Sequence, residues 1–212
     1  MAIRELSSLE KEVAAAVVLL GQSHNWEFAA YIDVSSGSLI ELITRMISVA
    51  ADPSGDVHKR IQSGASVIVH HNHLSQESLS SADWKGLVSL FDETFAHCAD
   101  GTTYWGRVRN DDAVDCVISN YLRHEMNAQN YLSQSLREQN CPYSSELGCF
   151  FRKEVINQAM KTRCFVDYEV SWGSQPLPVF PCMSIPAGAA GIFGRRISQH
   201  ISNASNMLAS SL

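Results

Sequence analysis

The chain has 212 residues, of which 45% are hydrophobic and 18% charged, so it can bury the core of one elaborated domain. Its net charge of −6 and its scattered Lys and Arg residues make nucleic acid an unlikely partner, because phosphate binding depends on clustered positive charge. No run reaches the roughly 18 apolar residues that span a bilayer. The apolar run Val13–Leu20 follows acidic residues, unlike a signal peptide. We therefore expect a cytoplasmic protein with no membrane partner.

The six cysteines form no C-x-x-C pair and show no short regular spacing. A disulfide scaffold is not expected at this chain length, and the spacing gives little support to a zinc site built from cysteine. We predict buried free thiols in a reducing compartment, at Cys98, Cys116, Cys141, Cys149, Cys164 and Cys182.

Helical and strand-like patterns alternate through the first half of the chain. A Ser7–Glu10 capping box with helically spaced apolar residues predicts a first helix that ends at Gly21. Strict alternation after it predicts a strand, and Ser35–Ser38 is typical of a hairpin turn. The expected elements are helices over 7–20, 56–62 and 80–98, and strands over 26–34, 39–49, 66–70 and 102–108.

After residue 110 the composition becomes rich in Asn, Gln and Ser. We expect helices over 111–140 and 145–162, a late strand over 163–172, a proline-marked irregular segment over 176–186, and a weak helix over 197–208. The predicted fold class is α/β (α+β), a mixed β-sheet flanked by helices. Residues 1–110 would form the core, and residues 111–212 a helical extension with a late strand and a flexible tail, packed on that core.

Three histidines, His70, His71 and His73, follow a short apolar strand. Side chains alternate along a strand, so His71 and His73 should leave its end on one side while His70 faces the other. Ser80 and Asp83 have the spacing of a helix start, with Ser80 as the N-cap. Two imidazoles that face a carboxylate make a three-ligand set for a divalent metal. Helix capping explains Asp83 equally well.

Such a site also needs a base that takes a proton from metal-activated water. Glu27 is the candidate, because it lies on the polar face of a predicted strand between Trp26 and Phe28. By spacing alone, an exposed strand glutamate remains the simpler explanation of this residue.

Together, the upstream strand Glu, the His-x-His pair and the Ser-x-x-Asp motif resemble the JAMM (JAB1/MPN/Mov34) metalloprotease family. The bacterial JAB branch that includes RadC-like proteins is most similar. The resemblance implies a cytidine-deaminase-like JAB/MPN core in which Zn²⁺ is bound by His71, His73 and Asp83. It also implies that Glu27 acts as general base and later as acid, and that Ser80 helps to hold an oxyanion.

The resemblance covers about residues 14–109, and two departures stand out within it. Six residues separate His73 from Ser80, where the family usually has seven, and Leu74 stands where proline is common. These departures leave open a displaced Asp83 or a degenerate site.

The implied activity is zinc-dependent hydrolysis of peptide or isopeptide bonds, with a ubiquitin-like protein or its conjugate as the substrate in a bacterium. The alternative is a non-catalytic or DNA-associated RadC-like interaction protein. The shorter loop favours that alternative, whereas the lack of a basic patch disfavours it. A nuclease with a ββα-metal site is weaker still, because the His pair ends a strand within an α/β order and no second ligand cluster follows at helical spacing.

Overall fold

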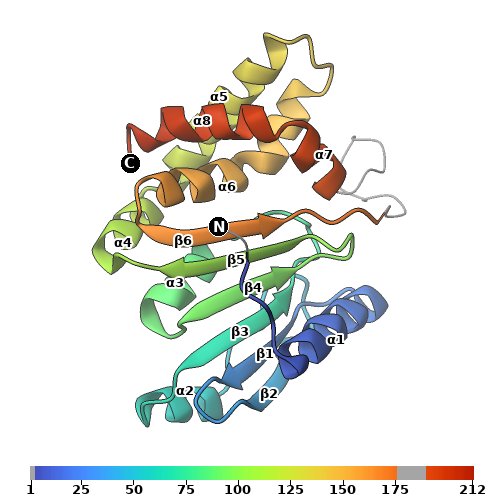
Figure 1. Cartoon of the computed structure of the whole chain (residues 1–212), viewed down its shortest axis with the longest axis vertical. Coiled ribbons are helices and arrows are strands. Elements are labelled where there is room, and N and C mark those ends of the chain that lie inside the picture. Colours follow the sequence, from blue (N-terminus) through green and yellow to red (C-terminus); the bar gives the residue numbers. More distant parts are fainter. Residues whose placement is uncertain (1–2, 176–189) are drawn as a thin grey trace.

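The computed structural model describes residues 3–175 and 190–212, which form one six-stranded mixed sheet flanked by helices (Figure 1). The expected α/β (α+β) class is confirmed. The elements are α1 (Ser8–His24), β1 (Phe28–Asp33), β2 (Ser38–Thr44), α2 (Gly55–Gln62), β3 (Val67–Asn72), α3 (Ser81–Ser89), β4 (Glu93–His97), β5 (Thr103–Val108), α4 (Asp111–Ser119), α5 (Tyr121–Arg137), α6 (Ser144–Thr162), β6 (Val166–Ser171), α7 (Ala190–Arg196) and α8 (Ser198–Ala209).

The strand order is β2-β1-β3-β4-β5-β6, and only the central β3–β4 pair is parallel. Because strand side chains alternate, the two faces of the sheet have different partners. On one face, Phe28, Ala30 and Ile68 pack against α1. On the other, Tyr31 and Val69 pack against α2. His71 shares this second face with Val69, whereas His70 faces α1, as the alternation predicts.

The C-terminal part packs on the same face as α2 and α3. One hydrophobic cluster joins Trp84 of α3 and Tyr104 of β5 to Phe151 of α6 and Tyr168 of β6, so a continuous core crosses residue 110. Strand β6 extends the sheet beside β5, and α5, α6 and α8 lie beyond it (Figure 1). Close packing also fixes α3 on the sheet, since a Cβ at Gly106 would lie 2.7 Å from the Trp84 ring.

The predicted helix over 80–98 is wrong in its second half. It ends at Ser89, and Glu93–His97 form β4 between β3 and β5. The residues in the middle of β4 are buried on both faces of the sheet, with Thr94 1% and Phe95 0% exposed. Such burial is typical of a strand in the middle of a sheet. The spacing of Trp84, Phe91 and Phe95 resembles that of an apolar helix face, although Trp84 lies in α3, Phe95 in β4 and Phe91 in the connection between them.

Other boundaries also differ from the expected ones. Helix α1 continues past Gly21 and ends at His24, and its C-cap Asn25 has a left-handed φ of 56°. Strand β2 ends at Thr44, and the predicted helix over 111–140 is divided at Asn120. The proline-marked segment over 176–186 lies outside the described residues.

The five cysteines within the described residues are free, but the prediction that they are buried is wrong for most of these five. Cys98 is buried, whereas Cys116, Cys149 and Cys164 are exposed. Cys141 is intermediate, and Cys182 lies outside the described residues. Within 3–175 and 190–212, no helix combines the length and apolarity needed to cross a bilayer.

A buried network of polar and charged side chains lies between β3 and α1. The Glu10 carboxylate accepts hydrogen bonds from Arg4 and from the Ser7 backbone N–H, and its Oε1 lies 3.4 Å from His70 Nε2. His70 Nδ1 lies 2.9 Å from Nε2 of His97. Burial alone would raise the pKa of Glu10, but its interactions with His70, Arg4 and Ser7 outweigh burial and lower it.

Glu10→Gln is expected to lower the free energy of unfolding by about 1–3 kcal/mol at pH 7, because the variant keeps an acceptor for Ser7 but loses the charge. The pKa of Glu10 is lower in the folded than in the unfolded chain, so its stabilisation is present above about pH 4.3 and is lost as the pH falls. Urea denaturation at several pH values should therefore show the gap between wild type and variant shrinking in acid. Exposed Glu12 of the same helix provides the control, since Glu12→Gln should change stability by less than about 0.5 kcal/mol. A Glu10→Gln gap that stays constant down to about pH 3 would contradict the role of the charge.

Candidate metal centre

The first two candidate ligands come from the end of β3. His71 pairs with Ala29 of β1 and Ala96 of β4, so strands on both sides fix its backbone. His73 lies just beyond the strand, where its backbone N–H donates to the His97 carbonyl at 2.9 Å. Its Nδ1 lies 2.8 Å from the Glu77 carbonyl oxygen. A carbonyl only accepts, so Nδ1 carries the proton and Nε2 keeps its lone pair for a metal.

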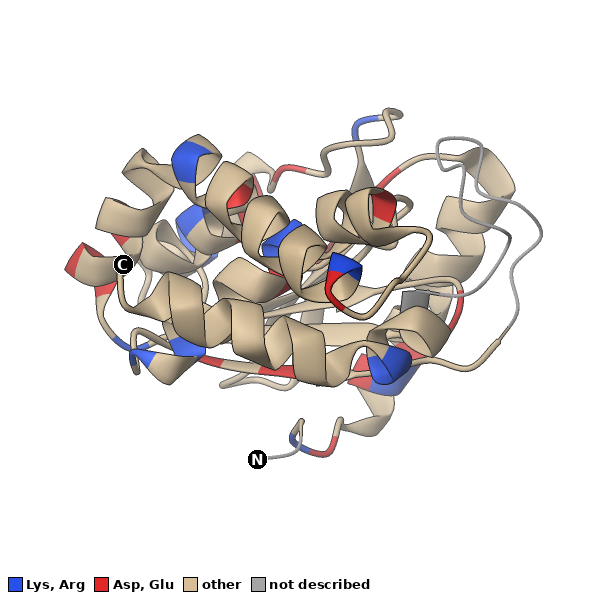
Figure 2. Ribbon diagram, turned by 90° about the horizontal axis from the view of Figure 1, so that it is seen from above, with Lys and Arg blue, Asp and Glu red and all other residues tan. Residues whose placement is uncertain are grey.

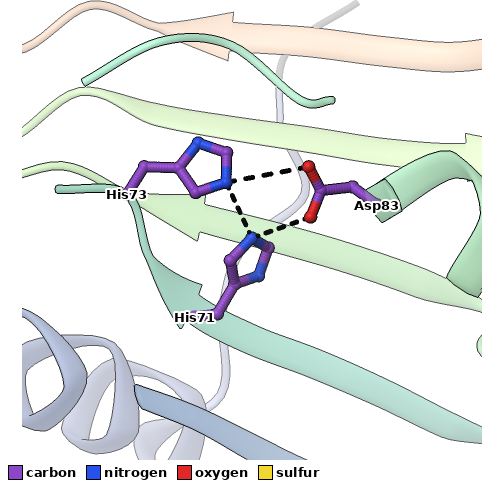
Figure 3. A group of neighbouring side chains, drawn as sticks. All are labelled: His71, His73 and Asp83. Carbon is purple, nitrogen blue, oxygen red and sulfur yellow. Dashed lines mark hydrogen bonds and ion pairs between the residues drawn. The ribbon is translucent and has the colours of Figure 1, made fainter. Parts of the chain in front are cut away.

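The third candidate ligand, Asp83, comes from the first turn of α3 and faces both imidazoles (Figure 3). The two histidine Nε2 atoms are 3.0 Å apart. His71 Nε2 lies 3.1 Å from Asp83 Oδ1, and His73 Nε2 lies 3.7 Å from Asp83 Oδ2. Donors on a tetrahedral zinc ion are about 3.3 Å apart, given Zn–N distances near 2.0–2.1 Å. The two histidine nitrogens come close to this spacing, and with one Asp83 oxygen the three donor atoms lie within 4.8 Å of one another, so the group could hold a metal ion.

Asp83 caps the helix and faces the histidines at the same time. The Ser80 backbone N–H and hydroxyl donate to Asp83 Oδ2 at 2.6 and 2.7 Å, while Oδ1 is the oxygen nearest His71. Capping therefore leaves Oδ1 facing His71, and the six-residue segment before Ser80 still brings Asp83 within 3.1 Å of His71. The Ser80 hydroxyl donates to Asp83 in this structure, and its role toward an oxyanion stays a prediction.

Burial and charge act together on these groups. Burial alone would lower the pKa of His71, but the hydrogen bond and charge of Asp83 raise it. Burial lowers the pKa of His73 to about 4, so this imidazole is neutral near pH 7. Burial would raise the pKa of Asp83, but the two histidines and the Ser80 N–H lower it. Neutral His73 and ionised Asp83 are in the protonation states that metal ligands require.

Glu27 lies immediately before β1 and lines the same cavity of about 590 Å³ as the three ligands. Its backbone N–H donates to the Ile47 carbonyl and its carbonyl accepts from Thr44. Among the described residues, none hydrogen-bonds its carboxylate. Burial, together with the charges of Asp83 and Asp52, raises the pKa of Glu27 to about 7 against the effect of His71. Glu27 is thus a partly buried cavity carboxylate, and the alternative of an exposed strand residue does not hold.

Other residues around the cavity could not be predicted from the sequence pattern. Lys153 of α6 lines it and binds Glu77 through a 2.6 Å contact between Nζ and Oε2. Glu77 in turn accepts the His73 hydrogen bond through its backbone carbonyl. Because 76 positions separate Lys153 from Glu77, no local motif could have predicted the pair.

No family model, curated protein or solved structure matches this chain. The similarity to JAMM metalloproteases therefore remains an expectation based on the motif residues.

Proposed function

We propose that this chain is a zinc-dependent hydrolase of peptide or isopeptide bonds, of the JAMM type. One observation carries the proposal: the donor atoms of His71, His73 and Asp83 lie within 4.8 Å of one another in a cavity that Glu27 also lines. Three protein ligands with room for a fourth are typical of catalytic rather than structural zinc sites.

The donor set favours zinc over other common ions. Two imidazole nitrogens and one carboxylate suit zinc, whereas magnesium and calcium prefer oxygen ligands. When bound, zinc supplies a Lewis acid for a scissile carbonyl and lowers the pKa of water to near 7. The Glu77 carbonyl fixes the His73 ring, and the Ser80 cap fixes the Asp83 carboxylate, as supporting contacts do in metal sites.

Glu27 supplies the proton transfers of the proposed reaction. Its carboxylate takes a proton from the attacking water, and the resulting acid gives that proton to the leaving amine nitrogen. Before metal binds, burial raises the pKa of Glu27 to about 7, which brings the carboxyl group toward the range in which it can both take up and release a proton. Partial burial in the cavity limits competing contacts with bulk solvent.

The proposed substrate is a ubiquitin-like protein or its conjugate, which is the class that the JAMM resemblance implies. The charge pattern supports a protein substrate. Among the residues that Figure 2 colours, Lys and Arg are scattered between Asp and Glu rather than gathered in one stripe, and the net charge is −6. Binding of a nucleic acid would instead require Lys and Arg side chains gathered in a positively charged patch that contacts the phosphates.

The test is a cleavage assay with the zinc-loaded full chain. Linear fusions and lysine-linked conjugates of ubiquitin-like proteins serve as substrates, and mass spectrometry locates the cut. We expect hydrolysis at the carboxyl end of the ubiquitin-like protein. A zinc-loaded chain that cleaves none of these substrates and no unrelated peptide would favour the non-catalytic, RadC-like alternative.

A further inference from the structure

A fully buried amide links α6 to both segments that carry the metal ligands. Asn157, 0% exposed, donates from Nδ2 to Ser78 Oγ at 2.8 Å and to the Leu79 carbonyl at 3.0 Å. Its Oδ1 accepts from Trp84 Nε1 at 2.8 Å. The three contacts need two N–H donors and one acceptor oxygen, which the asparagine amide supplies. Leucine has no polar atom and aspartate has no N–H donor, so neither reproduces all three contacts.

The partners of Asn157 adjoin the metal ligands. Ser78 and Leu79 lie in the segment between His73 and the helix cap, and Trp84 directly follows Asp83. Asn157 therefore spans the two segments whose separation determines the distance between His73 and Asp83.

The same helix contacts the ligand loop at a second point. One turn before Asn157, Lys153 binds Glu77, whose carbonyl accepts the hydrogen bond from His73. On the sheet side, the Tyr168 hydroxyl lies 2.6 Å from Ser78 Oγ, so β6 also holds the loop. These contacts come from the C-terminal part of the chain, to which the JAMM resemblance assigns no role.

We propose that Asn157 is a positioning residue of the metal centre, which holds the His73 loop and the Asp83 helix at the spacing that binds zinc. This inference rests on the proposed zinc function. According to this inference, α6 of the C-terminal part helps to hold the metal ligands in place. Contacts to the residues that carry the ligands affect metal affinity, because they hold the donor atoms in the orientation that the metal requires.

The test compares zinc affinity with stability in the full chain. Zinc dissociation constants are measured by competition with a chromogenic chelator, and urea midpoints are measured on the same samples. Asn157→Ala is expected to weaken zinc binding by about 10-fold or more. The control is Ile156→Ala, because Ile156 is also fully buried in α6 but has no polar group to contact the loop. It should lower the urea midpoint while leaving zinc affinity within about twofold, since a folded site binds alike whatever its global stability.

Ser78→Ala removes one of the three hydrogen bonds of Asn157. This variant tests the positioning role of Asn157 if Asn157→Ala does not fold. It should weaken zinc binding in the same direction, but less. Unchanged affinity in the folded Asn157 and Ser78 variants would overturn the inference, and so would an equal loss in Ile156→Ala. Wild type that binds no zinc would instead overturn the proposed function, so the two failures are distinguishable.

Discussion

Glu27→Gln is expected to lower kcat for amide hydrolysis by about 10²–10⁴-fold while zinc stays bound. Glutamine has the shape of glutamate but cannot carry a proton between water and the leaving amine. Glu27 is not among the residues whose donor atoms converge, so its replacement should leave the metal in place. The measurements are kcat on a ubiquitin-like fusion and zinc content of the same preparation.

Glu41→Gln provides the control for this change. Glu41 belongs to neighbouring β2 and does not line the cavity, so its replacement should leave kcat nearly unchanged. Full activity in Glu27→Gln would exclude Glu27 as the proton carrier. Loss of zinc in that variant would show that Glu27 supports the metal rather than the proton transfer.

Zinc removal is expected to abolish hydrolysis and to lower the melting temperature by about 8–16 °C. A ligand present at about 1,000 times its dissociation constant stabilises the folded state by about 4.1 kcal/mol, and each kcal/mol shifts the melting temperature by about 2–4 °C at this size. The measurement is a thermal melt in excess zinc and in excess chelator, with activity assayed after zinc is restored.

His73→Ala separates specific binding from general effects of the chelator. This variant lacks one donor, so zinc and chelator should give it the same melting temperature, and added zinc should not restore activity. A wild type that melts identically in zinc and in chelator would contradict the proposed stabilisation.

The site was predictable where its geometry is local. Alternation along β3 correctly separates His70 from His71, because successive strand side chains face opposite sides. The Ser80–Asp83 spacing correctly predicts a helix start, and the same turn brings Asp83 to the histidines. The strand pattern at Glu27 identified a residue that lines the cavity, although spacing alone favoured an exposed position.

The parts that sequence reasoning missed depend on tertiary contacts. Residues 93–97 pair with β3 and β5, and this pairing overrides a spacing that resembles a helix. The polar contacts of Lys153 and Asn157 reach the ligand loop across more than 70 positions, so no window along the sequence contains both ends. The partial burial of Glu27 likewise arises from distant segments that surround the cavity.

Zinc content of the freshly purified chain, measured by elemental analysis, decides whether His71, His73 and Asp83 form a metal site. We expect about one zinc per folded wild-type chain, as three converging ligands with an open fourth position imply. The ion should be lost in His73→Ala and in Asp83→Ala, and kept in Glu27→Gln. A folded wild type that contains no metal and takes up none from added zinc would contradict the account.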